Sequence, residues 1–419
     1  MAAAVDFNQY DPFAPAMQQH PFPWYAALRE SAPVWKHPAS GIVFVSRHRD
    51  VSRILADTTT YSSRFASMPT AGSSEVNAKI AAIMQRGFPR VSTMLTEDPP
   101  LQTRYRKTVG KALSTRRILA LEAKMRELTD EILSAWPARG HVDVMQTLAI
   151  PLPIRVIGHF LCMKAEVFPH VKRWSDASVA GLGAMITDAE RIAAAHSVVE
   201  LQRYWESELA ARLAHPNDDL LCALTQAEFE DETGAERRLD FPEMISILQQ
   251  LMVAGNETTT KVINETFKLL LENPRWFARM QSDPAVIPAV VEESLRLASP
   301  NQGMFRYVTR ETELDGVAIA KGALIWLMFG SANRDESVFP NPDAFDPERP
   351  NAKESVAFGR GAHFCIGAPL ARLELRVLFE QIAKRVAAFA LPRGFELRYE
   401  PSYILRGLAA LELDVAMRG

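Results

Sequence analysis

Hydrophobic residues recur at helical spacing over most of the chain, whereas β-rich runs are short and few. Between Pro99 and about Ala214 the apolar positions keep this spacing, and the breaks fall near 137–140 and at Pro151 and Pro153. Several helices are therefore predicted in this part of the chain. The pattern as a whole predicts a mainly α fold with small β-sheets.

One predicted helix is much longer than the others and runs from about residue 241 to about residue 272. Asp240 can cap its first turn, Pro242 suits that turn, and Asn273 and Pro274 follow its end. A helix of roughly thirty residues, at ~1.5 Å per residue, is about 45 Å long. We therefore expect this helix to run through the centre of the molecule.

Short strands are predicted at 33–36 and 41–46, which form a hairpin, and at 316–319 and 323–327. Residues of about 62–96 carry little helical pattern and contain several glycines, prolines and serines. For this segment we predict a long loop with one short helix.

The composition is that of a globular chain with a large core. Of 419 residues, 47% are apolar, and no linker, internal repeat or low-complexity tract divides them, so we predict one compact domain over 1–419. The net charge of −3 gives no reason to expect nucleic-acid binding. Three cysteines indicate a reducing compartment, by default the cytoplasm. Residues 1–30 hold no apolar stretch near the ~20 residues that span a bilayer, so no membrane contact is expected.

The most informative short segment is the glycine-rich run 358–372 around Cys365. Its glycines permit tight curvature and close approach to a flat ligand, and Pro369 suits the first turn of a helix. A cysteine at such a helix N-terminus is favoured as a thiolate, which is the form that binds metal. The alternative is a small buried hydrophobe, the usual state of an isolated cysteine. The flanking glycines, His363 and two arginines favour the metal ligand, because a packed thiol requires none of them.

This run resembles the haem-ligand signature of the cytochrome P450 monooxygenases. It carries every position of that signature: Phe358, Gly359, Gly361, His363, Cys365, Gly367, Leu370, Ala371 and Arg372. The resemblance implies the P450 fold of a soluble bacterial enzyme, with haem b (iron protoporphyrin IX) bound through Cys365 and contacted by Phe358, Gly359, His363 and Gly367. It also implies that helix 241–272 lies over the haem and that segment 62–96 contributes to the substrate site.

The middle of the long helix contains an unusual run, Ala254-Gly255-Asn256-Glu257 followed by three threonines. Glycine costs about 1 kcal/mol relative to alanine inside a helix, and threonine hydroxyls can divert to backbone carbonyls. One explanation for the glycine and the threonines is that they allow close packing against another helix. The run also resembles the acid–alcohol motif of the P450 family, which implies that Glu257 relays protons, that Thr258 holds dioxygen and its water, and that Ala254 and Gly255 contact the haem.

Further family positions are matched outside these two segments. Glu293 and Arg296 resemble the Glu-x-x-Arg element and Arg349 its distant partner, which implies a structural role around the cysteine loop. The haem propionates require cationic or hydrogen-bonding partners when partly buried. By position in the family these are His363, Arg306, Arg106 and Gln102. Many bacterial relatives carry histidine where this chain has Gln102.

The substrate is expected to be a small to medium, largely apolar organic molecule. Gln250, Val253 and Ala254 lie at helical spacing before the acid, and we expect them to face the substrate pocket together with Gln302, 301–305 and 402–405. Gln250 and Gln302 could supply polar contacts to the substrate, or could equally be packed against backbone or water.

A basic stretch could bind an acidic redox partner, a ferredoxin or flavodoxin-type protein. Runs of charged residues are more often simply exposed to solvent, so the docking role is a hypothesis that rests on the clustering of these basic residues. Its members are Arg104, Lys107, Lys111, Arg116, Arg117, Arg360 and Arg372.

The predicted reaction is insertion of one oxygen atom from O2 into the substrate by hydroxylation, O-dealkylation or epoxidation, with electrons from NAD(P)H through a ferredoxin and its reductase. Two alternatives are a peroxide-driven hydroxylase and a non-catalytic haem-thiolate sensor or carrier. The intact pair Glu257 and Thr258 disfavours both, since peroxide-driven hydroxylation normally goes with loss of this pair and a carrier requires no proton relay.

Overall fold

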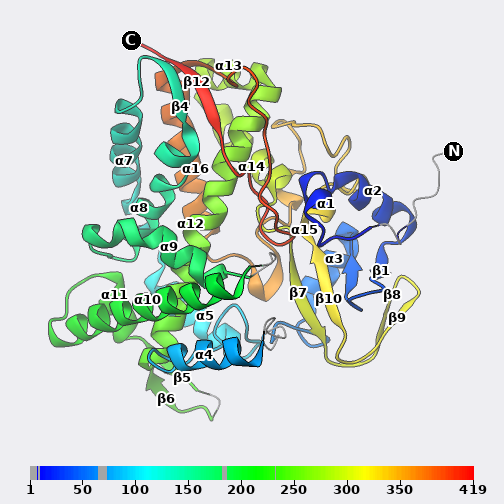
Figure 1. The fold of residues 1–419 in the computed structure, drawn as a ribbon, viewed down its shortest axis with the longest axis vertical. Helices are drawn as coiled ribbons and strands as arrows, with labels where there is room; N and C mark the ends of the chain where they lie inside the picture. Colours follow the sequence, from blue (N-terminus) through cyan, green and yellow to red (C-terminus); the bar gives the residue numbers. More distant parts are fainter. Residues whose placement is uncertain (1–6, 8–9, 65–72, 182–185, 232) are drawn as a thin grey trace. The chain divides into compact units, whose positions relative to one another are not determined.

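The computed structural model describes residues 7, 10–64, 73–181, 186–231 and 233–419. Contacts divide the chain into two compact units, each built from several segments. Unit 1 comprises Met1–Ser62, Arg126–Ala149 and Thr258–Gly419, and unit 2 comprises Ser63–Met125 and Ile150–Glu257. Helices dominate and the sheets are small, which confirms the predicted fold class (Figure 1). The single domain over 1–419 stays a prediction.

The largest sheet belongs to unit 1, with strand order β1-β2-β10-β7-β3. Strand β1 pairs antiparallel with β2, and β10 pairs parallel with β2 and antiparallel with β7 (Figure 1). Both β2 and β10 are apolar at nearly every position because their two faces are covered by protein. The strand bounds are β1 Val34–Lys36, β2 Val43–Val45, β3 Tyr61–Ser62, β7 Gly303–Val308 and β10 Leu324–Met328.

The structure confirms the predicted hairpin at 33–46 and the predicted strands at 316–327. β8 (Thr312–Leu314) pairs with β9 (Val317–Ile319) in unit 1, and β5 (Glu228–Glu230) pairs with β6 (Glu236–Arg238) in unit 2. The β8–β9 ladder contributes Leu314 and Ile319 to the hydrophobic core of unit 1, whereas β6 is exposed along its length.

A second sheet of unit 1 joins β4 (Arg139–Asp143), β12 (Glu412–Met417) and β11 (Val386–Ala390). Strand β4 lies where the sequence predicted only a break between helices. Its residues are mostly polar and exposed, so they carry no strand pattern of their own. Pairing with β12, near the other end of the chain, makes this segment a strand.

The helices of unit 1 surround these sheets. They are α1 Pro15–Gln19, α2 Phe22–Ser31, α3 His48–Ala56, α13 Pro274–Ser282, α14 Ile287–Ala298, α15 Phe329–Ala332 and α16 Ala368–Arg385. Those of unit 2 are α4 Ser74–Met84, α5 Leu101–Ala112, α6 Thr115–Ala120, α8 Pro151–Phe160, α9 Phe168–Val179, α10 Asp188–Ala214 and α11 Leu220–Thr225. Helix α7 (Glu122–Ser134) and helix α12 carry residues of both units.

Helix α12 spans Phe241–Glu272, which confirms the predicted long helix. Its first turn is closed reciprocally, because the Glu243 N–H donates to Asp240 Oδ1 at 2.9 Å and the Asp240 N–H donates to Glu243 Oε2 at 2.8 Å. The cap predicted at Asp240 is therefore confirmed.

The segment predicted as a long loop at 62–96 contains helix α4, which Ser73 caps by accepting from the Val76 N–H at 3.3 Å. One short helix was predicted there and is confirmed. Residues 65–72 of this segment lie outside the described residues.

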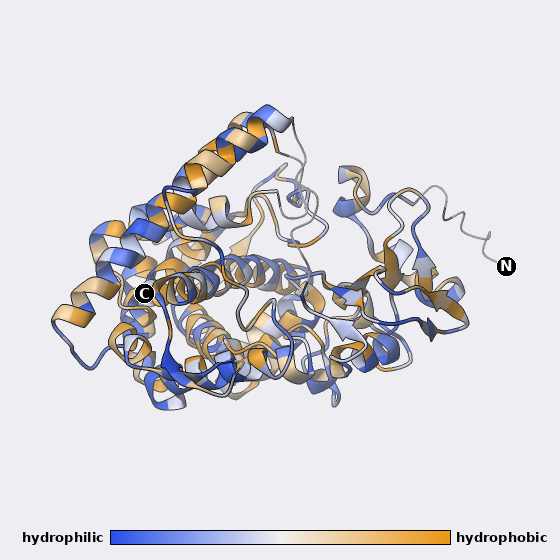
Figure 2. Ribbon diagram, turned by 90° about the horizontal axis from the view of Figure 1, so that it is seen from below, coloured by the Kyte–Doolittle hydropathy of each residue, from blue (hydrophilic) through white to orange (hydrophobic). Residues whose placement is uncertain are grey.

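Hydrophobic and hydrophilic residues alternate along the helices of both units (Figure 2). Within the described residues, every helix is too short or too polar to pass through a lipid bilayer.

A buried ion cluster in unit 1 joins α14 to the turn-rich segment before the cysteine loop. Arg296 donates to both carboxylate oxygens of Glu293, at 2.8 and 2.7 Å, and Arg349 Nε donates to Glu293 Oε1 at 3.2 Å. The side chains of Glu293 and Arg296 are 0% exposed. The structure thus brings together the three residues that the sequence placed in a structural role.

The ion cluster is connected to the cysteine loop by hydrogen bonds. Arg296 Nη1 donates to Asn333 O at 2.7 Å, and the Val356 N–H donates to Asn333 Oδ1 at 2.7 Å. The Gly359 N–H then donates to Val356 O at 2.8 Å. Asn333 is therefore the link, which the sequence did not indicate, between the cluster and the loop.

Helix α16, which follows the cysteine loop, contains one buried acid. Glu374 is 2% exposed, and its Oε1 has no hydrogen-bond partner among the described residues. Burial raises the pKa of Glu374 to about 8, so its carboxyl group is held mostly uncharged at neutral pH.

We predict that Glu293→Ala lowers the free energy of unfolding by about 3–5 kcal/mol, because it leaves two buried guanidinium groups without their carboxylate. Urea unfolding followed by circular dichroism measures the change. Glu292→Ala is the matched control, since Glu292 pairs with Arg372 at side-chain exposures of 29% and 40% and should cost only about 0–1 kcal/mol. Equal losses in the two variants would contradict the prediction.

Candidate haem-thiolate site

Residues 358–367 of unit 1 form the loop that leads into α16. The Cys365 N–H donates to Phe358 O at 2.9 Å, and the Ala368 N–H donates to Cys365 O at 3.3 Å. Cys365 is therefore fixed between the start of the loop and the first turn of the helix, where Pro369 stands as predicted. Its residue is partly exposed, and it forms no disulfide with the other cysteines in the described part of the chain.

Two glycines of the loop adopt left-handed backbone conformations, with φ of +68° at Gly359 and +67° at Gly361. A Cβ atom at Gly361 would lie 2.7 Å from Leu55 O, so the loop packs closely on α3. At Gly367 a Cβ atom would lie 3.8 Å from Cys365 Sγ, which is van der Waals contact, so position 367 lies beside the sulfur.

Two arginines hold the ends of the loop. Arg372 makes a bidentate ion pair with Glu292 at 2.5 and 2.9 Å, and its guanidinium lies 4.7 Å from the centre of the Phe358 ring. Arg360 donates to the carbonyl and the carboxylate of Glu354 at 2.7 and 2.8 Å. Both side chains are thus engaged within the protein.

Of the residues predicted to bind the haem propionates, two lie in unit 1. Arg306 on β7 is 3% exposed, and its Nη1 donates to Phe305 O at 2.7 Å. His363 ends a short 3-10 turn, Gly361–His363, and is half-buried. An imidazole and a buried guanidinium therefore accompany the cysteine in the same unit.

The other two predicted propionate ligands lie on α5 of unit 2. Gln102 is 0% exposed, and its Oε1 accepts a hydrogen bond from Thr103 Oγ1 at 3.1 Å. Arg106 lies one helical turn further and is half-buried. Spacing of four residues places both side chains on one face of α5.

Helix α12 remains α-helical throughout residues 254–260 despite the glycine and the threonines. A Cβ atom at Gly255 would lie 2.7 Å from Ile157 Cδ1, so the glycine permits close packing against α8. Ala254 is exposed and Thr258 is half-buried, and their spacing of four residues places them on one face of the helix.

The predicted catalytic acid is held by a neighbouring helix of unit 2. Glu257 is 8% exposed, and its Oε1 lies 3.6 Å from Nζ of Lys172 on α9. The same lysine forms an ion pair with Asp176. Asn256 Nδ2 donates to Ser175 Oγ at 2.7 Å, 81 positions away in the sequence. Lys172 and Ser175 carry no local signal in the sequence, because only the fold brings them to α12.

A polar cluster of unit 2 joins α5 to the first turn of α12. Tyr105 donates to Glu243 Oε1 at 2.6 Å, and Arg237 donates to both Glu243 oxygens at 2.7 Å. Burial, reinforced by the neighbouring carboxylate, raises the pKa of Tyr105 well above its ordinary value. Burial also disfavours the charged form of Glu243, but hydrogen bonds from Arg237, Tyr105 and the Asp240 N–H outweigh it and lower the pKa of Glu243. An ionised, buried carboxylate thereby anchors the helix that carries Arg106.

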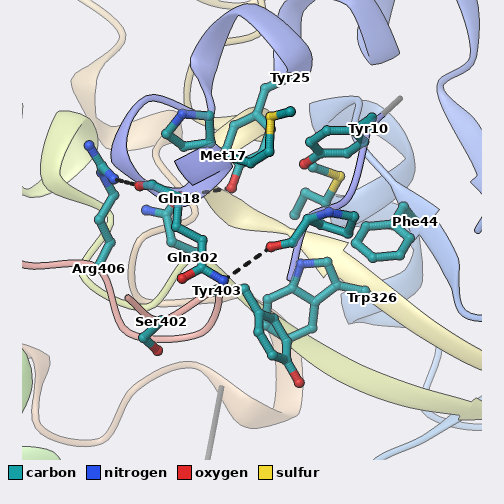
Figure 3. A pocket seen from close by; sticks show the side chains of 13 residues that line it. Tyr10, Met17, Gln18, Tyr25, Phe44, Gln302, Trp326, Ser402, Tyr403 and Arg406 are labelled. Atoms are coloured by element: carbon teal, nitrogen blue, oxygen red, sulfur yellow. Dashed lines mark hydrogen bonds between the residues drawn. The ribbon is translucent and has the colours of Figure 1, made fainter. Parts of the chain in front are cut away.

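The two glutamines predicted to orient a substrate have protein partners. In unit 2, Gln250 exchanges hydrogen bonds with Thr93 Oγ1 at 2.9 and 3.2 Å. In unit 1, Gln302 is 2% exposed, donates to Ser299 O at 2.7 Å and accepts from Tyr25 at 3.2 Å (Figure 3). Val253 is half-buried. Of the two uses that the sequence left open for Gln302, packing against the backbone is the one observed.

The predicted basic patch divides into paired and unpaired side chains. Arg104 pairs with Glu230, Arg117 with Asp218, Arg360 with Glu354 and Arg372 with Glu292. Among the described residues, Lys107, Lys111 and Arg116 are exposed and have no ion-pair partner. These three therefore carry the uncompensated positive charge of the patch.

The residues of the cysteine loop fit a haem. The Cys365 thiol is partly exposed and in no disulfide, and a cysteine sulfur is a donor that haem iron accepts. His363 and Arg306 supply a donor and a buried cation for propionates. No group of three or more His, Cys, Asp or Glu side chains that could hold a separate metal ion occurs in the described part of the chain.

Comparisons with known proteins identify the family. A family model described as Cytochrome P450 matches residues 183–390. Vitamin D(3) 25-hydroxylase of Pseudonocardia autotrophica is 31% identical over 415 residues, which is 98% of each chain. Erythromycin C-12 hydroxylase of Saccharopolyspora erythraea is 34% identical over 387 residues, 91% of each chain.

The fold comparison agrees with the sequence comparison. The structure of cytochrome P450 CREJ in complex with (4-ethylphenyl) dihydrogen phosphate matches with a TM-score of 0.88 and 31% identity, over 98% of this chain and 100% of that one. The chain therefore belongs to the cytochrome P450 family and is a haem-dependent monooxygenase of the bacterial kind.

Proposed function

We propose that this P450 inserts one oxygen atom from O2 into a small to medium, largely apolar organic substrate, by hydroxylation, O-dealkylation or epoxidation. The observation that carries the proposal is the glycine-lined Cys365 loop, together with an acid and an alcohol at consecutive positions, 257 and 258, of α12. Relatives named as hydroxylases of vitamin D(3) and erythromycin and as a steroid C26-monooxygenase support an apolar substrate of medium size. The three described cysteines, none in a disulfide, are consistent with the cytoplasm as its location.

Haem b with a thiolate ligand supplies the activation of dioxygen when it is bound. Cys365 would hold its iron, and His363, Arg306, Arg106 and Gln102 would bind its propionates. Phe358, Gly359 and Gly367 would line the thiolate face, and Ala254 the other.

Glu257 and Thr258 would move the protons that the reaction consumes. Lys172 Nζ, at 3.6 Å, is 38% exposed and connects the buried carboxylate to a solvated ion pair. Glu257 can therefore exchange protons with the surface without opening the site to bulk water. The Thr258 hydroxyl, next in the chain, both accepts and donates a hydrogen bond and would pass the proton on.

This pair also supports the monooxygenase over the two alternatives, peroxide-driven hydroxylation and a haem-thiolate sensor or carrier. Neither alternative consumes protons that must be delivered from the protein surface. A buried acid that is connected to the surface through Lys172 suits a reaction that takes up protons.

We propose that apolar contacts hold the substrate. The polar groups of Gln250 and Gln302 are occupied by Thr93, Tyr25 and backbone carbonyls, which argues against a strong polar contact from either side chain. Val253 and Ala254 remain available on α12 for apolar contact.

We propose an acidic ferredoxin or flavodoxin-type protein as the electron donor, ultimately fed by NAD(P)H. Lys107, Lys111 and Arg116, the unpaired members of the basic patch, would attract it, since long-range attraction depends on uncompensated charge.

The purified, reduced protein is expected to give the red-shifted carbon monoxide band of a thiolate-bound haem. In Cys365→Ser the band should be absent, because a hydroxyl does not replace the thiolate as ligand. Optical difference spectra measure both, and pigment content measured separately reports whether haem is still bound. An identical spectrum in the variant would overturn the proposal.

Glu257→Gln is expected to lower the rate of product formation about 100-fold, the lower range for loss of a general acid or base, while ligand dissociation constants stay within about twofold. Turnover with a surrogate ferredoxin and optical ligand titration measure the two effects. Asp176→Asn is the matched control, because it removes the other carboxylate paired with Lys172 and leaves Glu257 in place. A rate loss as large in the control would assign the effect to the lysine rather than to the acid.

Lys107→Glu and Arg116→Glu are expected to slow reduction by an acidic ferredoxin about tenfold at low ionic strength, and the difference should shrink at high salt. Stopped-flow reduction across a salt series gives the rates. Arg104→Gln and Arg117→Gln serve as controls with small expected effects, since both charges are already paired with carboxylates, those of Glu230 and Asp218. Salt-independent rates in all four variants would rule out the docking role.

A further inference from the structure

The C-terminal part of unit 1 contains a backbone hairpin, residues 399–408, whose tip is the segment 402–405. Tyr399 and Leu408 face each other in an antiparallel bridge, and the Glu400 N–H donates to Gly407 O at 2.9 Å. The tip residues are half-buried, whereas positions 406–408 are buried. The base of the hairpin thus belongs to the core and the tip to a partly open surface.

The hairpin tip is paired with a second segment that the sequence placed at the substrate. The Gln302 N–H donates to Ile404 O at 2.7 Å, and the Arg406 N–H donates to Pro300 O at 2.9 Å. Asn301 and Leu405 form an antiparallel bridge between the two hydrogen bonds. Any shift of the tip therefore displaces residues 300–302 as well.

Arg406 fastens one side of the hairpin to the N-terminal helix α1. It is 7% exposed, and its guanidinium donates to Gln18 O and, at 3.0 Å, to Gln19 O (Figure 3). It also lies 3.4 Å from the centre of the Tyr399 ring. The Gln19 side chain adds two hydrogen bonds to the Tyr399 backbone, at 2.7 and 2.9 Å. Because this buried guanidinium donates to backbone carbonyls, it fixes α1 and the hairpin to each other.

Lys261 fastens the other side of the hairpin to α12, one helical turn after Thr258. Its Nζ lies 2.7 Å from Glu400 Oε2, and its side chain is 9% exposed. A Cβ atom at Gly407 would lie 2.4 Å from Lys261 Cγ, so the lysine stem rests directly on the glycine backbone. The hairpin base therefore follows the position of α12.

Behind the tip there is almost no free space. The pocket lined by Gln18, Tyr25, Gln302, Trp326 and Tyr403, among others, has a volume of about 20 Å³, roughly the space of one water molecule (Figure 3). Gln18 Oε1 is buried there without a hydrogen-bond partner in the described residues, so one water would complete its bonding. The tip cannot retreat into this pocket unless the contacts of Arg406 are broken.

We propose that Arg406 and Lys261 are positioning residues that fix the tip 402–405 and thereby determine which substrates fit. Neither side chain needs to touch the substrate. The inference rests on the proposed function, because it assigns the tip to the wall of the substrate site.

The test compares Arg406→Gln and Lys261→Met with the wild type. Hydrogen exchange of the Gln302, Glu400 and Arg406 amides should accelerate about tenfold or more, while exchange elsewhere in unit 1 stays unchanged. Dissociation constants for rigid apolar ligands, read from the shift of the haem band, should fall about tenfold for the largest ligands, equivalent to about 1.4 kcal/mol, because the released tip can move away from them. The ratio of products should change, and Arg406→Lys should restore only part of the wild-type pattern because it lacks the planar fork.

Arg398→Gln is the matched control, since Arg398 adjoins the same hairpin but is 76% exposed and pairs only with Glu396. It should behave as the wild type. If Arg406→Gln fails to fold, Gln19→Ala carries the test, because it removes two hydrogen bonds to Tyr399 and keeps the guanidinium.

The two proposals fail differently. Variants that keep the reduced carbon monoxide band and show wild-type exchange, ligand constants and product ratios would overturn the positioning role. Absence of that band in the wild type would instead overturn the proposed function.

Discussion

The ion cluster of Glu293 with Arg296 and Arg349 is the interaction on which the cysteine loop depends. A carboxylate and two guanidinium groups removed from water are stable only when every hydrogen-bonding position is filled. Here the remaining positions are filled by backbone carbonyls of the turn-rich segment, including those of Asn333 and Pro340. The two buried guanidinium groups therefore determine the path of the turn-rich segment, because its carbonyls must lie where these groups can donate to them.

A short series of hydrogen bonds connects the segments between this cluster and the backbone of Cys365. Asn333 accepts from the Val356 N–H, Val356 accepts from Gly359, and Phe358 accepts from Cys365. Each step is a backbone or amide contact with little freedom to rotate. The backbone at Cys365 is consequently oriented by the fold itself, which suits its proposed role of holding the haem iron.

The features that could be predicted from the sequence are those whose determinants are neighbours in the chain. Helix α12 follows from its apolar spacing and from Asp240 and Glu243 at its start, and the cysteine loop follows from its glycines. Ser175 and Arg406 could not be predicted, because their partners lie 81 and 388 positions away. The amides of Gln250 and Gln302 look free in a sequence, and only the fold shows that protein groups already occupy them.

Glu374 has a consequence for the pH range in which the fold survives. Its pKa in the folded chain, about 8, lies above the ordinary value of 4.5, so the native state binds this proton more tightly than the unfolded chain does. The advantage of the neutral carboxyl is complete in acid and is lost as the pH rises through 8. A rise in pH from about 4.5 to about 8 therefore removes a stabilising contribution from the interior of α16, the helix that follows the Cys365 loop.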